Sequence, residues 1–324
     1  MPTGGKHAPR PRNGRGSFFG TVIVTVVVVL ALGGVGFGVW NLVAGAGGGG
    51  QSASSASSTP ETPFGTPTDH AAPSSGEASG GASGSAADGD LSWRDEDFAV
   101  DPSRTDWSFS DNGRKVVYLT IDDGPSENTQ AVLDILDKYG CKATFFVVGH
   151  DPDYYHMIKE AYDRGHTIGL HTMTHDYAIV YSSVGAYFDD LDQIGQVVKE
   201  QIGFVPCFIR FPGGSSNGIS AQYSQGIMTQ LVEDVQARGY QYYDWSVSTG
   251  DGSEHTADEL YGYATEPNAS GEYDTNIVML CHDSATKQTT VEALPRIIEF
   301  YQGMGYSFEA IDRSTWVCHH GVAN

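Results

Sequence analysis

Two pairs of polar side chains have the types and spacing of a hydrolytic metal site. Asp122 and Asp123 directly follow a short apolar run, so these adjacent carboxylates point in different directions from the end of a strand. His171 and His175 stand four residues apart at the end of another apolar run, and both can reach one ion from a helix or a tight loop. Two histidines and one carboxylate, with one position left open, are typical donors of a catalytic zinc site. We therefore expect a divalent metal to bind Asp123 and the two histidines, which leaves Asp122 free.

Arg210 stands at the end of a third apolar run, and an arginine in the mouth of a barrel needs an acidic partner. The free Asp122 is the obvious one. The residues that follow Arg210 are Pro212, Gly213 and Gly214. The glycines expose backbone N–H groups, which are the donors that stabilise a developing oxyanion. We therefore expect this segment to form the oxyanion side of the site.

A third histidine, His282, ends the apolar run 276–282 and brings an imidazole to the same face. Leu280 and Cys281 precede it. Side chains alternate along a strand, so the thiol of Cys281 points away from the face that carries His282. We therefore expect no nucleophilic cysteine, and His282 is a candidate for proton transfer.

The elements that position these residues follow a regular pattern from about residue 115 onward. The expected strands are 116–121, 142–149, 166–171, 207–211, 240–248, 276–282 and 306–311, and the clearest helical patterns are 127–139, 186–202 and 291–301. This alternation predicts parallel β-α units with right-handed crossovers and the working face at the carboxyl ends of the strands. We expect a distorted (β/α)7-type barrel, related to the eight-stranded type. An open doubly wound sheet is the alternative, but no glycine-rich phosphate loop follows the first strand.

The segments TIDDGP, HTMTH, RFPGG and LCH together resemble the motif series of the polysaccharide deacetylases with a NodB-type homology domain, carbohydrate esterase family 4. They occur in the family's order, each at the end of an expected strand, within residues 115–312. The resemblance implies that the general base is Asp122, that the metal ligands are Asp123, His171 and His175, that Arg210 orients the base and that His282 is the general acid. It also implies a substrate and oxyanion face made by Pro212, Gly213, Gly214, Trp245 and Leu280.

The resemblance implies hydrolysis of N-acetyl groups on a polysaccharide, with release of acetate. Zinc is the commonest metal of the family, and cobalt, nickel or manganese would suit the same ligands. Peptidoglycan N-acetylglucosamine is the favoured substrate, and chitooligosaccharide, poly-N-acetylglucosamine and acetyl-xylan stay open. A non-catalytic wall-binding module would be marked by loss of the metal ligands or the base, all of which are present.

Two positions depart from the family's pattern. Many members carry a bulkier residue, often Tyr, where this chain has Gly213; only the backbone N–H is needed there, so we expect activity to persist and the groove to be wider. The family also has a Trp on one strand and Asp-Trp in the following loop. Trp245 fits the strand and Asp251 fits the loop, although Gly252 replaces the loop Trp. We expect Asp251 to support the general acid, in preference to Asp244, whose match is in another register.

The N-terminal part differs in composition from the rest. Residues 1–17 are basic, and residues 18–40 form an apolar run long enough to cross a hydrocarbon core of about 30 Å. The basic flank predicts a cytoplasmic N-terminus, so we expect a single-pass membrane anchor with the catalytic domain, 93–324, outside the cell. A secreted form, cleaved near Ala46, is the alternative. Residues 41–92 are rich in Gly, Ser, Ala and Pro, which predicts a flexible linker.

The chain has 18 basic and 40 acidic residues, a net charge of −22. This charge argues against nucleic acid as a partner. The sequence indicates no protein partner. Pairing among the four cysteines, Cys141, Cys207, Cys281 and Cys318, stays open, since free buried thiols and disulfides both fit. His320, near the C-terminus, is expected to be solvated.

Overall fold

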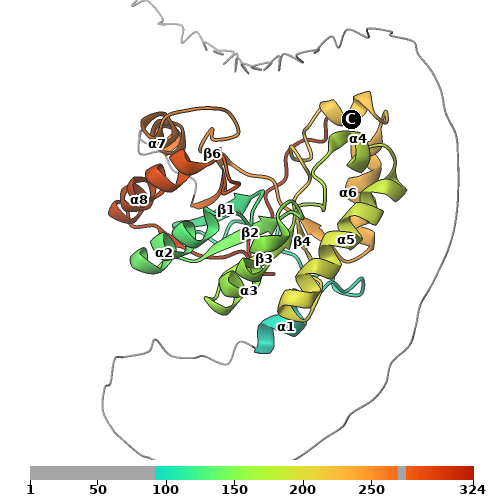
Figure 1. Cartoon of the computed structure of the whole chain (residues 1–324), viewed down its shortest axis with the longest axis horizontal. Coiled ribbons are helices and arrows are strands. Elements are labelled where there is room, and N and C mark those ends of the chain that lie inside the picture. Colours follow the sequence, from blue (N-terminus) through green and yellow to red (C-terminus); the bar gives the residue numbers. More distant parts are fainter. Residues whose placement is uncertain (1–91, 269–274) are drawn as a thin grey trace, which may run out of the picture. The chain divides into compact units, whose positions relative to one another are not determined.

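The computed structural model describes residues 92–268 and 275–324 (Figure 1). All the described residues belong to one compact unit. The expected basic tail, membrane anchor and nearly all of the expected linker lie outside the described residues. Among the helices that are described, none has the length and apolar character needed to span a membrane.

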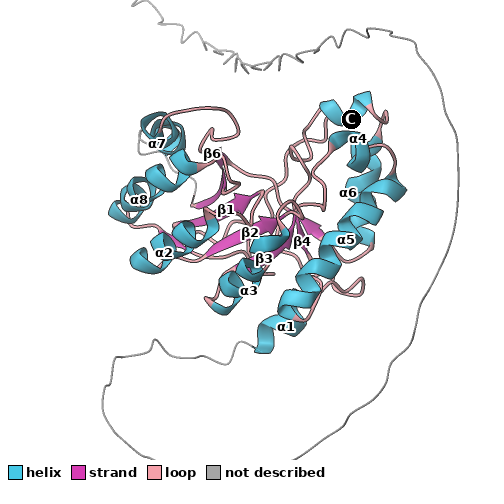
Figure 2. Ribbon diagram, viewed as in Figure 1, coloured by secondary structure: helices cyan, strands magenta, loops and turns pink. Residues whose placement is uncertain are grey.

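A parallel sheet forms the centre of the described part (Figure 2). Its strands are β1 (Val116–Asp122), β2 (Ala143–Val147), β3 (Thr167–Leu170), β4 (Phe208–Ile209), β5 (Gln241–Tyr242), β6 (Val247–Ser248), β7 (Asn276–His282) and β8 (Ser307–Phe308). The strand order is β5-β4-β3-β2-β1-β7-β6, and β8 pairs with the start of β1. The expected parallel α/β architecture is thus confirmed.

One expected strand is divided in the structure. The expected single strand 240–248 consists of two short strands, β5 beside β4 and β6 beside β7, and no pairing joins β5 to β6 in the part of the chain that is described. Between them the backbone of Asp244 donates to the carbonyl of Cys318, and that of Ser246 donates to Val278. The backbone of this segment therefore forms its hydrogen bonds outside a continuous ladder. The sheet is a curled half-barrel, which fits the expected distorted (β/α)7-type barrel.

Helices cover the outside of the sheet (Figure 1). They are α1 (Ser92–Phe98), α2 (Thr129–Tyr139), α3 (His156–Asp163), α4 (Tyr177–Val180), α5 (Val184–Ile202), α6 (Ile227–Ala237), α7 (Ala257–Thr265) and α8 (Gln288–Gly303), with short 3₁₀ turns η1 (Pro152–Tyr154), η2 (Ile219–Gln222) and η3 (Glu266–Asn268). The three expected helices correspond to α2, α5 and α8. In α2 the buried side chains Val132, Leu133 and Leu136 lie on one face, the spacing that packs a helix against a sheet.

The alternation of side chains along β1 divides the apolar interior in two. Val117 and Leu119 pack in the large cluster that contains the buried faces of the helices. Val116 and Tyr118 belong to a second cluster, on the inner side of the curled sheet, with residues such as Phe208. Both faces of the strand are therefore buried, as is usual for parallel sheets. All four cysteines are buried, and Cys141, Cys207 and Cys281 are free thiols.

The register of the sheet places the chemistry. The Cα atoms of Asp122 at the end of β1 and His282 at the end of β7 are direct partners across the two strands. His171 directly follows β3, and Arg210 directly follows β4. Because the strands are parallel, all these side chains gather at one end of the half-barrel.

Candidate active site

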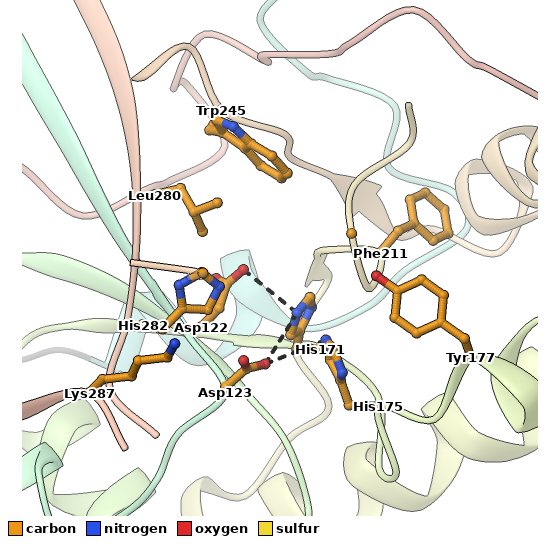
Figure 3. Close-up of a pocket in the computed structure, with 12 residues that line it drawn as sticks. Asp122, Asp123, His171, His175, Tyr177, Phe211, Trp245, Leu280, His282 and Lys287 are labelled. Carbon is orange, nitrogen blue, oxygen red and sulfur yellow. Dashed lines mark ion pairs between the residues drawn. The ribbon is translucent and has the colours of Figure 1, made fainter. Parts of the chain in front are cut away.

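Asp123, His171 and His175 converge on one point, and we call them the metal triad (Figure 3). The Nε2 atom of His171 lies 3.6 Å, and that of His175 3.5 Å, from Oδ1 of Asp123. A tetrahedral zinc with ligand bonds of about 2.0–2.2 Å keeps its ligand atoms about 3.4 Å apart. The same Oδ1 atom is buried and accepts no hydrogen bond from any described residue. The geometry and this orphaned oxygen both fit a divalent cation.

The state of His171 also suits a metal ligand. Its Nδ1–H donates to the backbone carbonyl of Arg210 at 2.7 Å, which fixes the ring and turns Nε2 toward the triad. Complete burial, together with the neighbouring His175, lowers the pKa of His171 to about 3. The imidazole is therefore neutral at physiological pH, as a metal ligand must be.

The loop that carries the two histidines is strained and tightly anchored. Within the described residues, the non-glycine positions with positive φ are Asp123 at 68°, Thr172 at 89° and His175 at 49°. Such a conformation costs about 1–3 kcal/mol per residue and needs support from its surroundings. The buried carboxylate of Asp190, on α5, accepts hydrogen bonds from the backbone N–H of Met173 at 2.5 Å and of Thr174 at 3.1 Å. Asp190 therefore holds this loop in place.

Asp122 and Arg210 form a buried ion pair beside the triad. The guanidinium NH1 group lies 2.8 Å from Oδ1 of Asp122, and its remaining donors bind the carbonyls of Tyr243 and Asp244 and the hydroxyl of Thr120. Desolvation raises the pKa of Asp122, while the charge of Arg210 opposes this. The pair gives the site a fixed carboxylate of increased basicity.

His282 and Asp251 form a second charged pair. The Nδ1–H of His282 donates to Oδ1 of Asp251 at 2.8 Å, and the Oδ2 atom of Asp251 accepts from Thr290 at 2.8 Å. Burial by itself would lower the pKa of His282, but the hydrogen bond and charge of Asp251, with the charges of Asp122 and Asp123, raise it to about 9. His282 thus carries a proton at neutral pH.

The structure places Asp244 away from His282. The carboxylate of Asp244 accepts from the backbone N–H of Ser215 and that of His320, each at 2.8 Å. The ring of His320 packs edge-on against Trp245 at 4.8 Å, and its Nε2 lies 2.6 Å from the Trp245 carbonyl. The expectation that His320 is solvated is wrong, because the C-terminal segment folds back and holds the tryptophan. Gly214 completes this packing, since a Cβ atom there would lie 3.0 Å from the indole ring.

The loop after β1 is fastened to the end of β7 by Asp283. Its backbone N–H donates to the carbonyl of Asp122 at 3.1 Å, and its Oδ2 accepts from Thr129 at 2.6 Å. Its Oδ1 lies so close to Gly124 that a Cβ atom there would clash. Burial raises the pKa of Asp283 to about 7. These contacts fix the direction in which the two adjacent carboxylates of β1 point.

A cavity of about 210 Å³ lies over the metal triad. Figure 3 shows Trp245 and Leu280 on one side of it, Tyr177 and Phe211 on the other, and Lys287 at its edge. Asp122, His282 and Gly213 line the same cavity. Arg210 and Asp251 are not part of the lining but bind the lining residues Asp122 and His282. Pro212 and Gly214 flank Gly213 in the sequence. The predicted site residues are therefore brought together around one space.

The expected widening of the groove at Gly213 is not found. A Cβ atom on Gly213 would clash with the hydroxyl of Tyr177, so the ring of Tyr177 occupies the space that a larger residue would fill. Tyr177, Asp190 and Lys287 are the site residues that the sequence argument missed. Tyr177 could have been noticed because it stands two residues after His175; the other two carry no distinguishing signal in the sequence.

The curled half-barrel, with the metal triad, a buried carboxylate and a cationic histidine around one cavity, defines a hydrolase scaffold. Residues 110–231 match the family described as polysaccharide deacetylase. A peptidoglycan-N-acetylglucosamine deacetylase of Bacillus cereus is 30% identical over 220 residues, which cover 64% of this chain and 72% of the relative. A bifunctional xylanase/deacetylase of Pseudobutyrivibrio xylanivorans is 30% identical over 61% of this chain and 30% of its own length.

Among solved structures, the catalytic domain of the peptidoglycan N-acetylglucosamine deacetylase from Eubacterium rectale is similar, with a TM-score of 0.64. The two are 43% identical, and the match covers 69% of this chain and 100% of that domain. The chain therefore belongs to the polysaccharide deacetylase family. It is a hydrolase of the amide bond in N-acetyl groups.

Proposed function

We propose that this protein is a metal-dependent N-deacetylase of an extracellular polysaccharide, with peptidoglycan N-acetylglucosamine as its substrate. The observation that carries the proposal is the grouping of three functions around one cavity: the metal triad, a carboxylate held by Arg210, and a histidine held by Asp251. Amide hydrolysis needs help at both ends of the bond, because the carbonyl is a poor electrophile and the amine a poor leaving group. The grouping offers activation of the carbonyl and of water at one end of the bond and a proton for the amine at the other.

Asp123, His171 and His175 would hold the metal, and zinc is the best match to two imidazoles and one carboxylate. When bound, such an ion polarises the acetyl carbonyl and makes water more acidic. The remaining steps fall to the protein's own groups.

Asp122 accepts a proton from water as the new O–C bond forms and the carbonyl electron pair moves onto the acetyl oxygen. Gly213 lines the cavity, and we assign to its backbone N–H the role of donor to that oxygen. When the C–N bond breaks, its electron pair stays on nitrogen, and His282 supplies the proton that lets the amine leave. The products are acetate and a free amino sugar.

A polymeric substrate is supported by the surface next to the cavity. An open groove of about 530 Å³ continues past His175 and Tyr177 to Ile219 and Tyr223. Ile219 is 50% and Tyr223 44% exposed, which is high for large apolar side chains. The C–H face of a sugar ring packs well on such a surface. We assign the groove to the sugar unit next to the one that is deacetylated.

Peptidoglycan is preferred to the other acetylated polymers because two of the matched proteins bear that name and the chain carries a candidate anchor. We place the catalytic domain, 93–324, outside the cell, joined by the linker 41–92 to a membrane span at 18–40. The full chain should then stay with membranes after a high-salt wash, and its N-terminal sequence should begin near Met1. A mature protein that begins near Gly47 would contradict the anchor and favour the secreted alternative.

The activity is tested by acetate release from peptidoglycan, chitooligosaccharide, poly-N-acetylglucosamine and acetyl-xylan, with the full chain in detergent. We expect the highest kcat/KM on peptidoglycan, loss of activity after chelation and recovery with zinc, cobalt or nickel. Asp122→Asn is the matched control, since it should keep the metal and lose turnover. Undiminished activity in the metal-free protein would overturn the metal dependence, and no release from any N-acetylated polymer would overturn the proposed function.

A further inference from the structure

Tyr177 is the one aromatic hydroxyl that Figure 3 shows directed into the space above the metal triad. It is the first residue of α4, and its ring packs edge-on against His175 at 5.9 Å and Tyr181 at 5.4 Å. These contacts leave the ring little freedom. Its hydroxyl makes no hydrogen bond with any of the described residues, although it lines the cavity.

Tyr177 and Gly213 line the same cavity. The hydroxyl of Tyr177 lies against Gly213, so close that a Cβ atom would clash with it. Gly213 has φ of 75°, and its N–H has no backbone acceptor among the described residues. Two hydrogen-bond donors without a protein acceptor therefore belong to neighbouring residues of the cavity lining, and the two residues come from separate loops.

The neighbouring tyrosine shows what a purely structural hydroxyl does here. Tyr181, which directly follows the same helix, is fully buried and donates to the carbonyl of Pro212 at 2.7 Å. This bond already ties α4 to the segment 212–214. The hydroxyl of Tyr177 is therefore not required to hold that segment, and it remains available to a ligand.

We propose that Tyr177 is a further catalytic residue, whose hydroxyl donates a hydrogen bond to the acetyl oxygen of the substrate while that oxygen gains negative charge. The role rests on the proposed function. A phenol, with an ordinary pKa of about 10, keeps its proton at neutral pH, so it acts as a donor and not as the acid. The proton count of the reaction is unchanged: water gives one proton to Asp122, and nitrogen receives one from His282.

Such a donor accelerates the reaction because it binds the charged oxygen more tightly than the neutral carbonyl. Gly213 has no side chain. The hydroxyl of Tyr177, which comes from the loop of His175, supplies a side-chain donor at that place. Removal of one oxyanion donor typically lowers kcat about 10²–10³-fold. Because Gly213 and the metal triad remain, we expect the lower end of this range, about 10²-fold.

The test is Tyr177→Phe in the full chain, which keeps the ring and removes only the hydroxyl. Tyr154→Phe, on η1 outside the cavity, is the matched control. For each protein we would measure kcat and KM for acetate release from chitotetraose, bound zinc, Tm, and the inhibition constant of a chitotetraose in which a methylphosphonyl group replaces one acetyl group. This group imitates the tetrahedral, charged state.

We expect Tyr177→Phe to lower kcat about 10²-fold at nearly unchanged KM, zinc content and Tm, and to weaken the tetrahedral inhibitor by the factor lost in kcat/KM. The control should match the wild-type chain. A kcat within threefold of wild type, or a loss that parallels loss of zinc, would overturn this role alone. Absence of acetate release by the wild-type chain from chitotetraose and from peptidoglycan alike would instead overturn the proposed function and this role with it.

Discussion

The charge of Asp251 determines the pH range in which His282 can act as an acid. Burial acts to lower the pKa of His282, yet the contact with Asp251 and the nearby carboxylates raise it to about 9. Asp251→Asn keeps an acceptor for Nδ1–H and removes the charge. Burial should then prevail, so the pKa of His282 should fall to the ordinary histidine value of about 6.5 or below.

The direction of the pH dependence follows from the role of His282 as the acid. His282 is active while protonated, so activity is lost as pH rises through its pKa. At pH 8 a group of pKa 9 is about 90% protonated, and one of pKa 6.5 about 3%, so we expect about 30-fold lower activity in Asp251→Asn. Below pH 6 the two proteins should differ much less. On the acidic side both should lose activity together, as Asp122, whose pKa is also raised, becomes protonated.

The assay is the pH profile of kcat/KM for acetate release, measured in both proteins with the same metal. A bound cation shifts the basic limb of both proteins in the same direction, so the displacement between the profiles is the quantity that tests the argument. Glu254→Gln is the matched control, since it removes one negative charge from an exposed position in the same loop. If the basic limb of Asp251→Asn coincides with that of wild type, Asp251 does not set the pKa of the acid and our assignment of the pair is wrong.

Three further perturbations test the rest of the site. His175→Ala should lose most bound zinc and all measurable deacetylation while the fold persists, and activity in the metal-free variant would exclude it as a ligand. Asp190→Ala should weaken zinc affinity about 10–100-fold, because the strained loop of the two histidines loses its hydrogen bonds to this carboxylate. Asp189→Ala, at an exposed position, should leave zinc affinity unchanged. Equal zinc affinities in the two variants would show that the loop keeps its conformation without Asp190. Tyr223→Ala should raise KM for a hexasaccharide several-fold and leave KM for a monosaccharide unchanged, and equal effects on both would exclude a second sugar in the groove.

The sequence predicted the parts of the fold that depend on local patterns. The runs at β1 and β7 are long and apolar because both faces are buried, and a helix such as α5 shows its apolar face at helical spacing. The groups at the strand ends could be placed together for the same reason, since parallel strands bring their carboxyl ends to one side. Asp122 and His282 are the clearest example, as direct partners across two strands.

Contacts between segments that are distant in the sequence could not be predicted. Tyr177 fills the space beside Gly213 only because α4 lies against the loop after β4, and no local pattern records that approach. Asp190 lies on a helix among other acidic residues, where a solvated carboxylate is the usual interpretation. The break between β5 and β6 depends on hydrogen bonds to the C-terminal segment, which offers no strand pattern of its own.

The two proton-transfer groups of the site differ in the environment that raises the pKa of each. Desolvation raises the pKa of Asp122, which makes its carboxylate a stronger base, and the charge of Arg210 opposes this rise and favours the ionised form. The carboxylate of Asp251 raises the pKa of His282 and favours the cationic form of the ring. Amide hydrolysis needs a base without its proton and an acid that holds one, and the cation beside Asp122 and the carboxylate beside His282 favour this division. Each environment comes from a partner on another strand or loop, so the half-barrel itself assigns the roles of base and acid to two residues that stand side by side on adjacent strands.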